Sequence, residues 1–243
     1  MNEREYLALL ESANAEELSQ LLRRPSAEEE RLLAVYFGEA RLARLRRLAL
    51  SGPRRGARRG NVVVLHGIMG GELTVFPPNK SSQGVWLNFL RIAVGAVGWL
   101  RMTPEPRSQF DVRATGILKK WYSEMLLGLA ADQWNVQAFW FDWRLDLAES
   151  ADALRKQIDG WFGPGEPVNL VAHSMGGLVS RTYILRHPER WAKGGRLIML
   201  GTPNLGSFAI PQVITGALDT VRKLALVDVT HSRAELLGVL NSW

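Results

Sequence analysis

The sequence predicts an α/β protein built on a mostly parallel sheet with helices on both faces. Short apolar runs typical of buried strands recur along the chain, at 61–65, 133–142, 168–172 and 196–200. Helical apolar spacing fills the intervals between them, at 111–129, at 150–162 and directly after Ser174. Because strand and helix alternate in this way, we expect parallel strands joined by right-handed crossovers.

Composition limits the class of protein. The chain has 243 residues, 47% hydrophobic and 22% charged, which suits one globular domain with a small appendage. It has no cysteine, which excludes disulfide and thiol chemistry. No secretory signal or membrane-spanning run is visible, so we expect a cytoplasmic protein. The formal charge of +6 comes mostly from dispersed arginines, and without a nucleic-acid-binding module it predicts no nucleic-acid partner.

Residues 1–50 are predicted to form a helical appendage. Asn2, Asn14 and Ser26 are each followed three residues later by a glutamate, which is the pattern of a capping box at a helix start. The third helix has an apolar face that needs a partner, either the main domain, which we favour, or a separate protein. Residues 51–60 contain glycine, proline and four arginines, and are predicted to be a basic linker to a domain at 61–243.

A glycine-rich loop follows the first strand of that domain. It reads His66-Gly-Ile-Met-Gly-Gly71, and it lacks the endings of a phosphate loop or a dinucleotide fingerprint. Such a loop after a buried strand can direct backbone N–H groups at an anion, and Ile68 is the expected donor. His66 is predicted to support the turn by hydrogen bonding.

Two irregular stretches are expected beside this core. The interval at about 72–108 has four prolines around a central apolar piece, and it is predicted to be a cap-like insertion. Residues at about 208–243 are predicted to form lid or connecting helices.

Ser174 lies between a predicted strand and a predicted helix, with Ala172 two residues before it and Gly176 two residues after it. Small neighbours at these positions are typical of a nucleophile elbow, in which a tight turn exposes the serine. The turn also directs the Met175 N–H towards an oxyanion beside the serine. This serine, the glycine-rich loop, Asp142–Arg144 and Gly201–Ser207 all follow predicted strands, where parallel sheets bind ligands.

Over residues 61–207 the chain resembles the α/β-hydrolase superfamily, and within it the lecithin:cholesterol acyltransferase-like and lipase-like branch. The resemblance is carried by Leu65–Gly71, Val85–Asn88, Ala114–Leu118 with Trp121-Tyr122, Phe141–Arg144, Ala172–Gly177 and Leu200–Ser207. It implies Ser174 as the nucleophile and the N–H groups of Ile68 and Met175 as the oxyanion hole, with no cofactor and no metal. Ala172 and His66 depart from the residues that many relatives have there.

The acid and base of the triad are missing from the pattern. In this fold they follow the serine in the order acid, then histidine, but after Ser174 only His187 and His231 remain. His231 follows Asp228 by three residues, which leaves no room for the usual helix and strand between acid and base. We therefore expect the sequence to be the N-terminal part of a longer hydrolase, with acid and base beyond Trp243. The chain alone would then be nearly inactive.

The resulting functional hypothesis is a serine hydrolase of lipid-like carboxylic esters that acts through an acyl-enzyme on Ser174. Two alternatives stay open. One is an O-acyltransferase of the lecithin:cholesterol acyltransferase type, and the other is a non-catalytic binding protein on a hydrolase scaffold. The expected partner is a small-molecule or lipid ester; peripheral membrane contact is left open, and the sequence predicts no oligomeric state.

Overall fold

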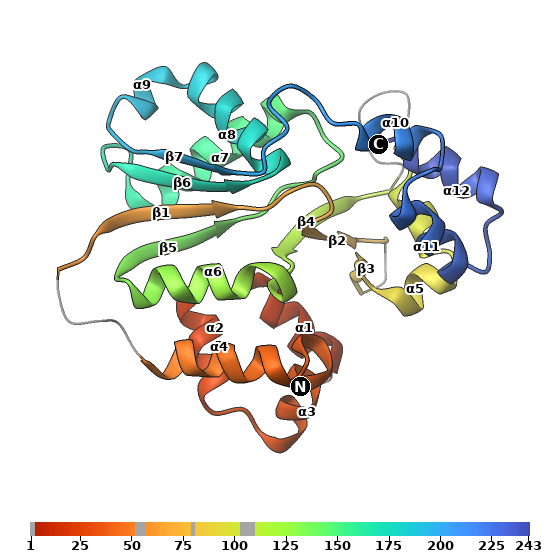
Figure 1. The fold of residues 1–243 in the computed structure, drawn as a ribbon, viewed down its shortest axis with the longest axis horizontal. Helices are drawn as coiled ribbons and strands as arrows, with labels where there is room; N and C mark the ends of the chain where they lie inside the picture. Colours follow the sequence, from red (N-terminus) through yellow and green to blue (C-terminus); the bar gives the residue numbers. More distant parts are fainter. Residues whose placement is uncertain (1–2, 52–56, 79–80, 103–109) are drawn as a thin grey trace.

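The computed structural model describes residues 3–51, 57–78, 81–102 and 110–243, and the central element is a parallel four-stranded sheet (Figure 1). Its order is β5-β1-β6-β7, with bounds Trp134–Phe139, Gly60–Leu65, Val168–His173 and Leu197–Leu200. Strand β1 pairs with β5 on one side and β6 on the other, and its four apolar residues after Asn61 are all buried. Because a central strand is covered on both faces, its residues form a continuous apolar run in the sequence.

Helices cover both faces of this sheet. Val63 and Leu65 of β1 share a core cluster with residues of α7 (Leu147–Phe162) and α8 (Met175–Arg186). The alternate residues Val62 and Val64 share another with α6 (Lys119–Ala131). This alternation follows from the two-residue period of a strand. The predicted α/β architecture with helices on both faces is therefore confirmed.

The N-terminal segment forms four helices that pack below α6 in Figure 1. They are α1 (Glu3–Ser12), α2 (Ala15–Arg23), α3 (Ala27–Phe37) and α4 (Glu39–Ser51). The capping boxes predicted at Asn14 and Ser26 are both present. The one predicted at Asn2 lies outside the described residues. The helices have a core of their own, which also includes Leu127 of α6.

A small antiparallel sheet of order β3-β2-β4 lies beside the main sheet, with bounds Gln83–Trp86, Gly71–Val75 and Val112–Ile117. The prediction of a helix from residue 111 was wrong for this stretch, since 112–117 form β4 and the helix begins at Lys119. Residues of β4 pair with β2, some forty positions earlier in the chain. Strand formation therefore depends on a partner that helical periodicity cannot reveal.

The remaining helices lie before β7, after it, or against the small sheet. The short α9 (Pro188–Trp191) precedes β7. Helix α5 (Phe89–Ala93) contacts α11 (Asp219–Val227), and the 3₁₀ helix η1 (Ala96–Leu100) contacts α12 (Arg233–Leu240). Helix α10 (Ala209–Ile214) also contacts α12. Asp228 directly follows α11, which extends to Val227.

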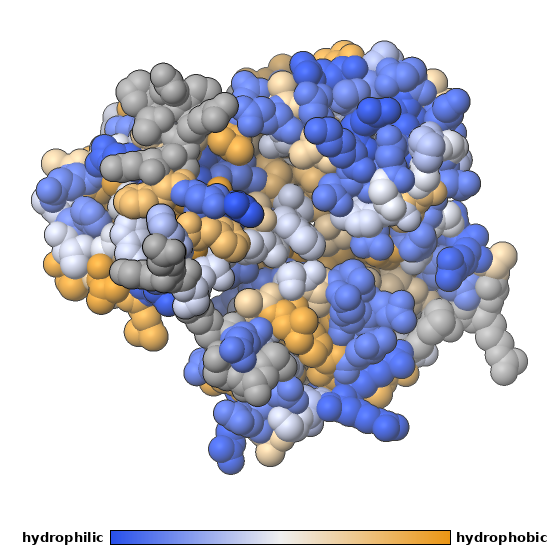
Figure 2. Space-filling model, turned by 180° about the vertical axis from the view of Figure 1, so that it is seen from behind, coloured by the Kyte–Doolittle hydropathy of each residue, from blue (hydrophilic) through white to orange (hydrophobic). Residues whose placement is uncertain are grey.

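Several large apolar side chains on this group of helices face outwards. Figure 2, seen from behind, shows apolar surface at this end of the molecule, on the left. The exposed residues include Phe89, Leu90, Val94, Phe208, Ile214, Leu226 and Val229. Of the helices described, none has both the length and the apolar character needed to cross a bilayer.

Candidate functional site

Ser174 occupies the single residue between the end of β6 and the start of α8. Its backbone has φ 51° and ψ −121°, a conformation that non-glycine residues rarely adopt. The backbone N–H of Ser174 donates to the carbonyl of Leu200 at 2.8 Å, which ties the turn to the end of β7. A positive φ at a serine costs of order 1–3 kcal/mol, and the surrounding strands and helix hold it in place.

The small residues around Ser174 have a steric reason. A Cβ added at Gly176 would lie 2.5 Å from the carbonyl oxygen of His66, and one added at Gly177 would lie 2.0 Å from Oγ1 of Thr202. The first turn of α8 is therefore pressed against the end of β1 and the loop after β7. Ala172, two residues before the serine, is fully buried in β6.

The glycine-rich loop after β1 passes directly beside Ser174. A Cβ at Gly67 would lie 2.9 Å from the Cβ of Ser174, so only glycine allows this approach. The loop closes in a turn in which the Gly70 N–H donates to the Gly67 carbonyl at 3.0 Å, and Met69 has φ 60°. The backbone N–H groups of Ile68 and Met175 donate to no acceptor in the described part of the chain. The structure thus places Ser174 directly before Met175 and beside the loop that carries Ile68, the two residues predicted to supply oxyanion donors.

His66 is buried under the loop and holds its shape. Its Nδ1 lies 2.7 Å from the Gly67 carbonyl, and its Nε2 accepts from the Phe141 N–H at 3.2 Å. The ring also stacks on Phe141, with centroids 4.1 Å apart. Burial lowers the pKa of His66 to about 4, so the ring is neutral at pH 7. With both nitrogens occupied, His66 supports the turn, as predicted.

Tyr122 and His173 also lie at this site, although the sequence analysis predicted no role for either of them. The Tyr122 hydroxyl accepts from the Gly67 N–H at 2.9 Å and lies 2.9 Å from Nδ1 of His173. Tyr122 comes from α6 and is almost fully buried, whereas His173 is the last residue of β6 and is exposed. These contacts join residues more than fifty positions apart, so no local pattern indicates them.

The two histidines after Ser174 have partners elsewhere. His187 Nε2 lies 2.7 Å from Asp152 of α7. His231 Nδ1 lies 2.7 Å from Asp228, whose Oδ1 also accepts from Thr230 and from the His231 N–H. The Asp228–His231 pair sits against η1, since a Cβ at Gly98 would lie 2.9 Å from His231 Nε2. Figure 1 places this group beyond the small sheet, apart from the β6–α8 turn.

Asp142 also has a partner away from Ser174, because it forms a buried ion pair with Arg144. Arg144 Nε and Nη2 contact the two carboxylate oxygens at 2.9 and 2.5 Å. The Arg144 Nη1 donates to the carbonyl of Leu100 at 2.7 Å, which joins the end of β5 to η1. This pair is a structural tie between the main sheet and η1.

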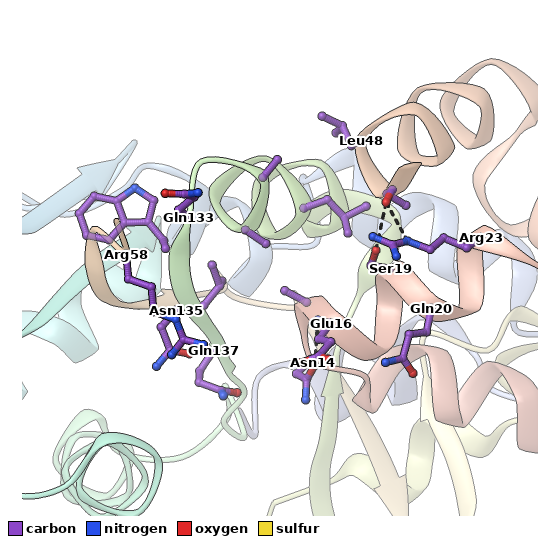
Figure 3. Close-up of a pocket in the computed structure, with 17 residues that line it drawn as sticks. Asn14, Glu16, Ser19, Gln20, Arg23, Leu48, Arg58, Gln133, Asn135 and Gln137 are labelled. Carbon is purple, nitrogen blue, oxygen red and sulfur yellow. Dashed lines mark hydrogen bonds between the residues drawn. The ribbon is translucent and has the colours of Figure 1, made fainter. Parts of the chain in front are cut away.

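A cavity of about 520 Å³ lies away from Ser174, between the N-terminal helices and the β5 edge of the sheet (Figure 3). One wall carries Asn14, Glu16 and Gln20 of the N-terminal segment, and the other carries polar side chains of the β5 segment. Ser19 and Arg23 both donate to the Ala49 carbonyl, which fixes α2 to α4 beside it. None of the predicted site residues lines this cavity.

The family model described as lecithin:cholesterol acyltransferase matches residues 106–224, just under half of the chain. This segment is lecithin:cholesterol acyltransferase-like. It contains Ser174, the elbow and the β6–β7 pair, and the glycine-rich loop precedes it. The resemblance predicted from the sequence is confirmed, together with the α/β-hydrolase fold. The match indicates an enzyme of the lipid acyltransferase or esterase type. A search of curated proteins found no match.

Proposed function

We propose that this chain carries the nucleophile of a serine hydrolase that acts on lipid-like carboxylic esters. The observation that supports this most is the backbone of Ser174, whose φ of 51° presents the serine on a turn in contact with the glycine-rich loop. A folded chain retains such a conformation only when neighbouring groups impose it, and strain of this kind concentrates at functional sites. A plain strand-to-helix turn has no need of it.

The chemistry follows from this geometry. Ser174 Oγ attacks the ester carbonyl, and the N–H groups of Ile68 and Met175 donate hydrogen bonds to the carbonyl oxygen as negative charge forms on it. The C–O bond to the alcohol then breaks, the alcohol leaves with a proton, and the acyl group stays on Ser174. Water attacks the acyl-enzyme and releases the acid.

The proton on Ser174 Oγ has no acceptor in the described contacts. The chain has four histidines: His66 is buried and neutral, and His173, His187 and His231 contact Tyr122, Asp152 and Asp228. We therefore expect this chain to acylate slowly, with solvent as the base. An oxyanion hole without its triad still accelerates acyl chemistry by about 10³ over water.

The outward-facing apolar side chains on α5, α10 and α11 favour a lipid-like substrate delivered from an interface. A soluble protein seldom exposes many large apolar residues on neighbouring helices unless they contact a partner or a membrane. Peripheral contact with a membrane is part of this proposal.

Acyl transfer to an alcohol is the second candidate, because the matched family is named for that reaction. The first half of the reaction is the same, and an alcohol replaces water in the second. Incubating the protein with a p-nitrophenyl ester, with and without added long-chain alcohol, separates the two by their products: free acid alone, or acid with a new ester.

A fluorophosphonate probe tests the nucleophile itself. We expect label at Ser174 by peptide mass spectrometry, at a rate at least about tenfold above that of the urea-unfolded chain. Ser174→Ala should abolish labelling. Ser180→Ala, which alters a buried helix serine bonded to the Gly176 carbonyl, should leave it in place. Equal labelling of folded and unfolded protein, or label at another residue, would contradict the proposal.

A further inference from the structure

Among the residues that the structure describes, the Tyr122 hydroxyl is the one hydrogen-bonding group that contacts both the glycine-rich loop and the end of β6, just before Ser174. It lies 2.9 Å from the Gly67 nitrogen and 2.9 Å from Nδ1 of His173. Gly67 and His173 are the residues immediately before Ile68 and Ser174. We propose that Tyr122 is the positioning residue of this site, and that it sets the distance between the oxyanion loop and the nucleophile. This inference rests on the function proposed above.

The proton arrangement follows from the chemistry of the three groups. The Gly67 N–H can only donate, so the tyrosine oxygen accepts it. The hydroxyl proton of Tyr122 also needs an acceptor, and among the described contacts of this hydroxyl only His173 Nδ1 can accept it, so we infer that Nδ1 accepts. Neutral His173 therefore carries its proton on Nε2. The Gly67 N–H thus donates to the Tyr122 hydroxyl, and the hydroxyl donates to the His173 imidazole. Each hydrogen bond polarises the next one in this series.

The glycine-rich loop packs closely against the Tyr122 hydroxyl and His173. A Cβ at Gly70 would lie 2.9 Å from the Tyr122 oxygen, and one at Gly67 would lie 3.0 Å from His173 Nδ1. The Tyr122 side chain is almost fully buried, and burial raises the pKa of its hydroxyl, so it stays protonated. The loop has other anchors, from Trp86 to the Met69 carbonyl and from the Leu118 N–H to the Gly70 carbonyl. The first anchor comes from β3 of the small sheet and the second from the N-cap of α6, and neither of them contacts β6.

The consequence for catalysis is specific. If the loop moves away from β6, the Ile68 N–H moves away from the position of the oxyanion. The Ile68 N–H stabilises the transition state much more than the bound ester. Moving it away should therefore lower the rate of acylation and leave the affinity for the probe unchanged.

Tyr122→Phe removes only the hydroxyl and leaves the ring in the core. Tyr183→Phe is the matched control, because Tyr183 is a buried tyrosine of α8 whose hydroxyl bonds no described residue. In the 243-residue protein we expect exchange of the Gly67 amide hydrogen, followed by NMR, to become at least about tenfold faster in Tyr122→Phe. The maximal rate of fluorophosphonate labelling should fall about tenfold, with the half-saturating probe concentration unchanged. Tyr183→Phe should change neither.

The wild-type protein offers a measurement that needs no variant. Nitrogen-15 shifts of neutral His173 should show the Nε2–H tautomer, and a predominant Nδ1–H tautomer would overturn the proposal even if Tyr122→Phe fails to fold. Unchanged Gly67 exchange in Tyr122→Phe, or faster exchange with an unchanged labelling rate, would also overturn it. If wild-type Ser174 is never labelled, the proposed function fails, and the exchange and tautomer results still decide whether Tyr122 ties the loop to the strand.

Discussion

The carboxylate of Glu11 accepts a hydrogen bond from the backbone N–H of Lys119 at 2.7 Å, and so joins α1 to the start of α6. The N-cap of α6 is Leu118, which has no side chain able to cap the helix. The next N–H, of Lys120, donates to the hydroxyl of Tyr36 in α3 at 3.1 Å. Two of the unpaired N–H groups that every helix start exposes are therefore satisfied by the N-terminal helices.

This junction is closed by further contacts around Glu11. The Lys119 ammonium donates to the Glu11 carbonyl at 2.5 Å, and the Tyr36 hydroxyl donates to the Glu11 carboxylate. A Cβ at Gly116 would lie 2.6 Å from the Glu11 carbonyl oxygen, so β4 needs glycine where α1 meets it. Since Tyr122 is one turn further along α6, we propose that the N-terminal helices support the site through this helix.

The Tyr36 hydroxyl provides the first prediction. Tyr36→Phe removes a donor to Glu11 and the acceptor for Lys120, so we expect it to lower the free energy of unfolding by about 1–3 kcal/mol. Tyr6→Phe is the control, because the buried Tyr6 hydroxyl has no hydrogen-bond partner among the described residues and its removal should cost nothing. Urea unfolding of both variants checks this, and equal losses would show that the Tyr36 hydroxyl contributes no specific support.

The second prediction concerns the glycines around the elbow. Gly176→Ala places a methyl group 2.5 Å from the backbone oxygen of His66, which cannot move without shifting β1. We expect a loss of about 1–3 kcal/mol in unfolding free energy and slower labelling of Ser174. Gly128→Ala in α6 meets nothing within 4 Å and should be neutral or stabilising by up to about 1 kcal/mol. A Gly176→Ala protein as stable as the wild type would contradict the close packing described here.

The sequence predicted the features that depend on local patterns. The strand runs of β1 and β6, the small residues around Ser174 and the caps at Asn14 and Ser26 each lie within a few residues of the structure they specify. Sequence periodicity carries such information because each pattern reflects burial or capping within one element.

Contacts between distant segments could not be predicted in this way. Strand β4 exists because it pairs with β2, and α6 is capped by Glu11 from 108 positions earlier. Tyr122 has the spacing of an ordinary helix residue, and its contact with Gly67 becomes visible only when α6 packs on the sheet. These relationships decide how the site is held, and no single segment encodes them.

Strain at Ser174 gives the third prediction. Glycine adopts a φ of 51° without the clash that a Cβ brings, so Ser174→Gly should unfold with a free energy about 1–2 kcal/mol above that of Ser174→Ala. This reverses the usual order, in which glycine is less stable than alanine. Ala172→Gly, at a buried strand position, should show the usual order and lose stability. If Ser174→Gly is less stable than Ser174→Ala, the elbow does not strain its serine.

The last prediction uses the buried ring of His66. Burial lowers its pKa from 6.5 to about 4, so between these values the unfolded chain binds a proton there and the native chain does not. The free energy of unfolding should therefore fall as the pH drops from 6.5 towards 4, by up to about 3 kcal/mol from this ring. The buried carboxyl of Glu11 has the opposite effect on the free energy of unfolding. Burial raises the pKa of this carboxyl to about 7, so its contribution to that free energy falls as the pH rises towards 7.

His66→Asn isolates the contribution of the ring. The asparagine amide keeps a donor near the Gly67 carbonyl but does not titrate, so its stability should depend less on pH over this window than that of the wild type. Urea unfolding of both proteins at pH 7 and pH 5 gives the difference in slope, in which Glu11 and the other groups cancel. Identical slopes would mean that the pKa of His66 is the same in the folded and the unfolded protein, and that the loop beside Ser174 is open to water.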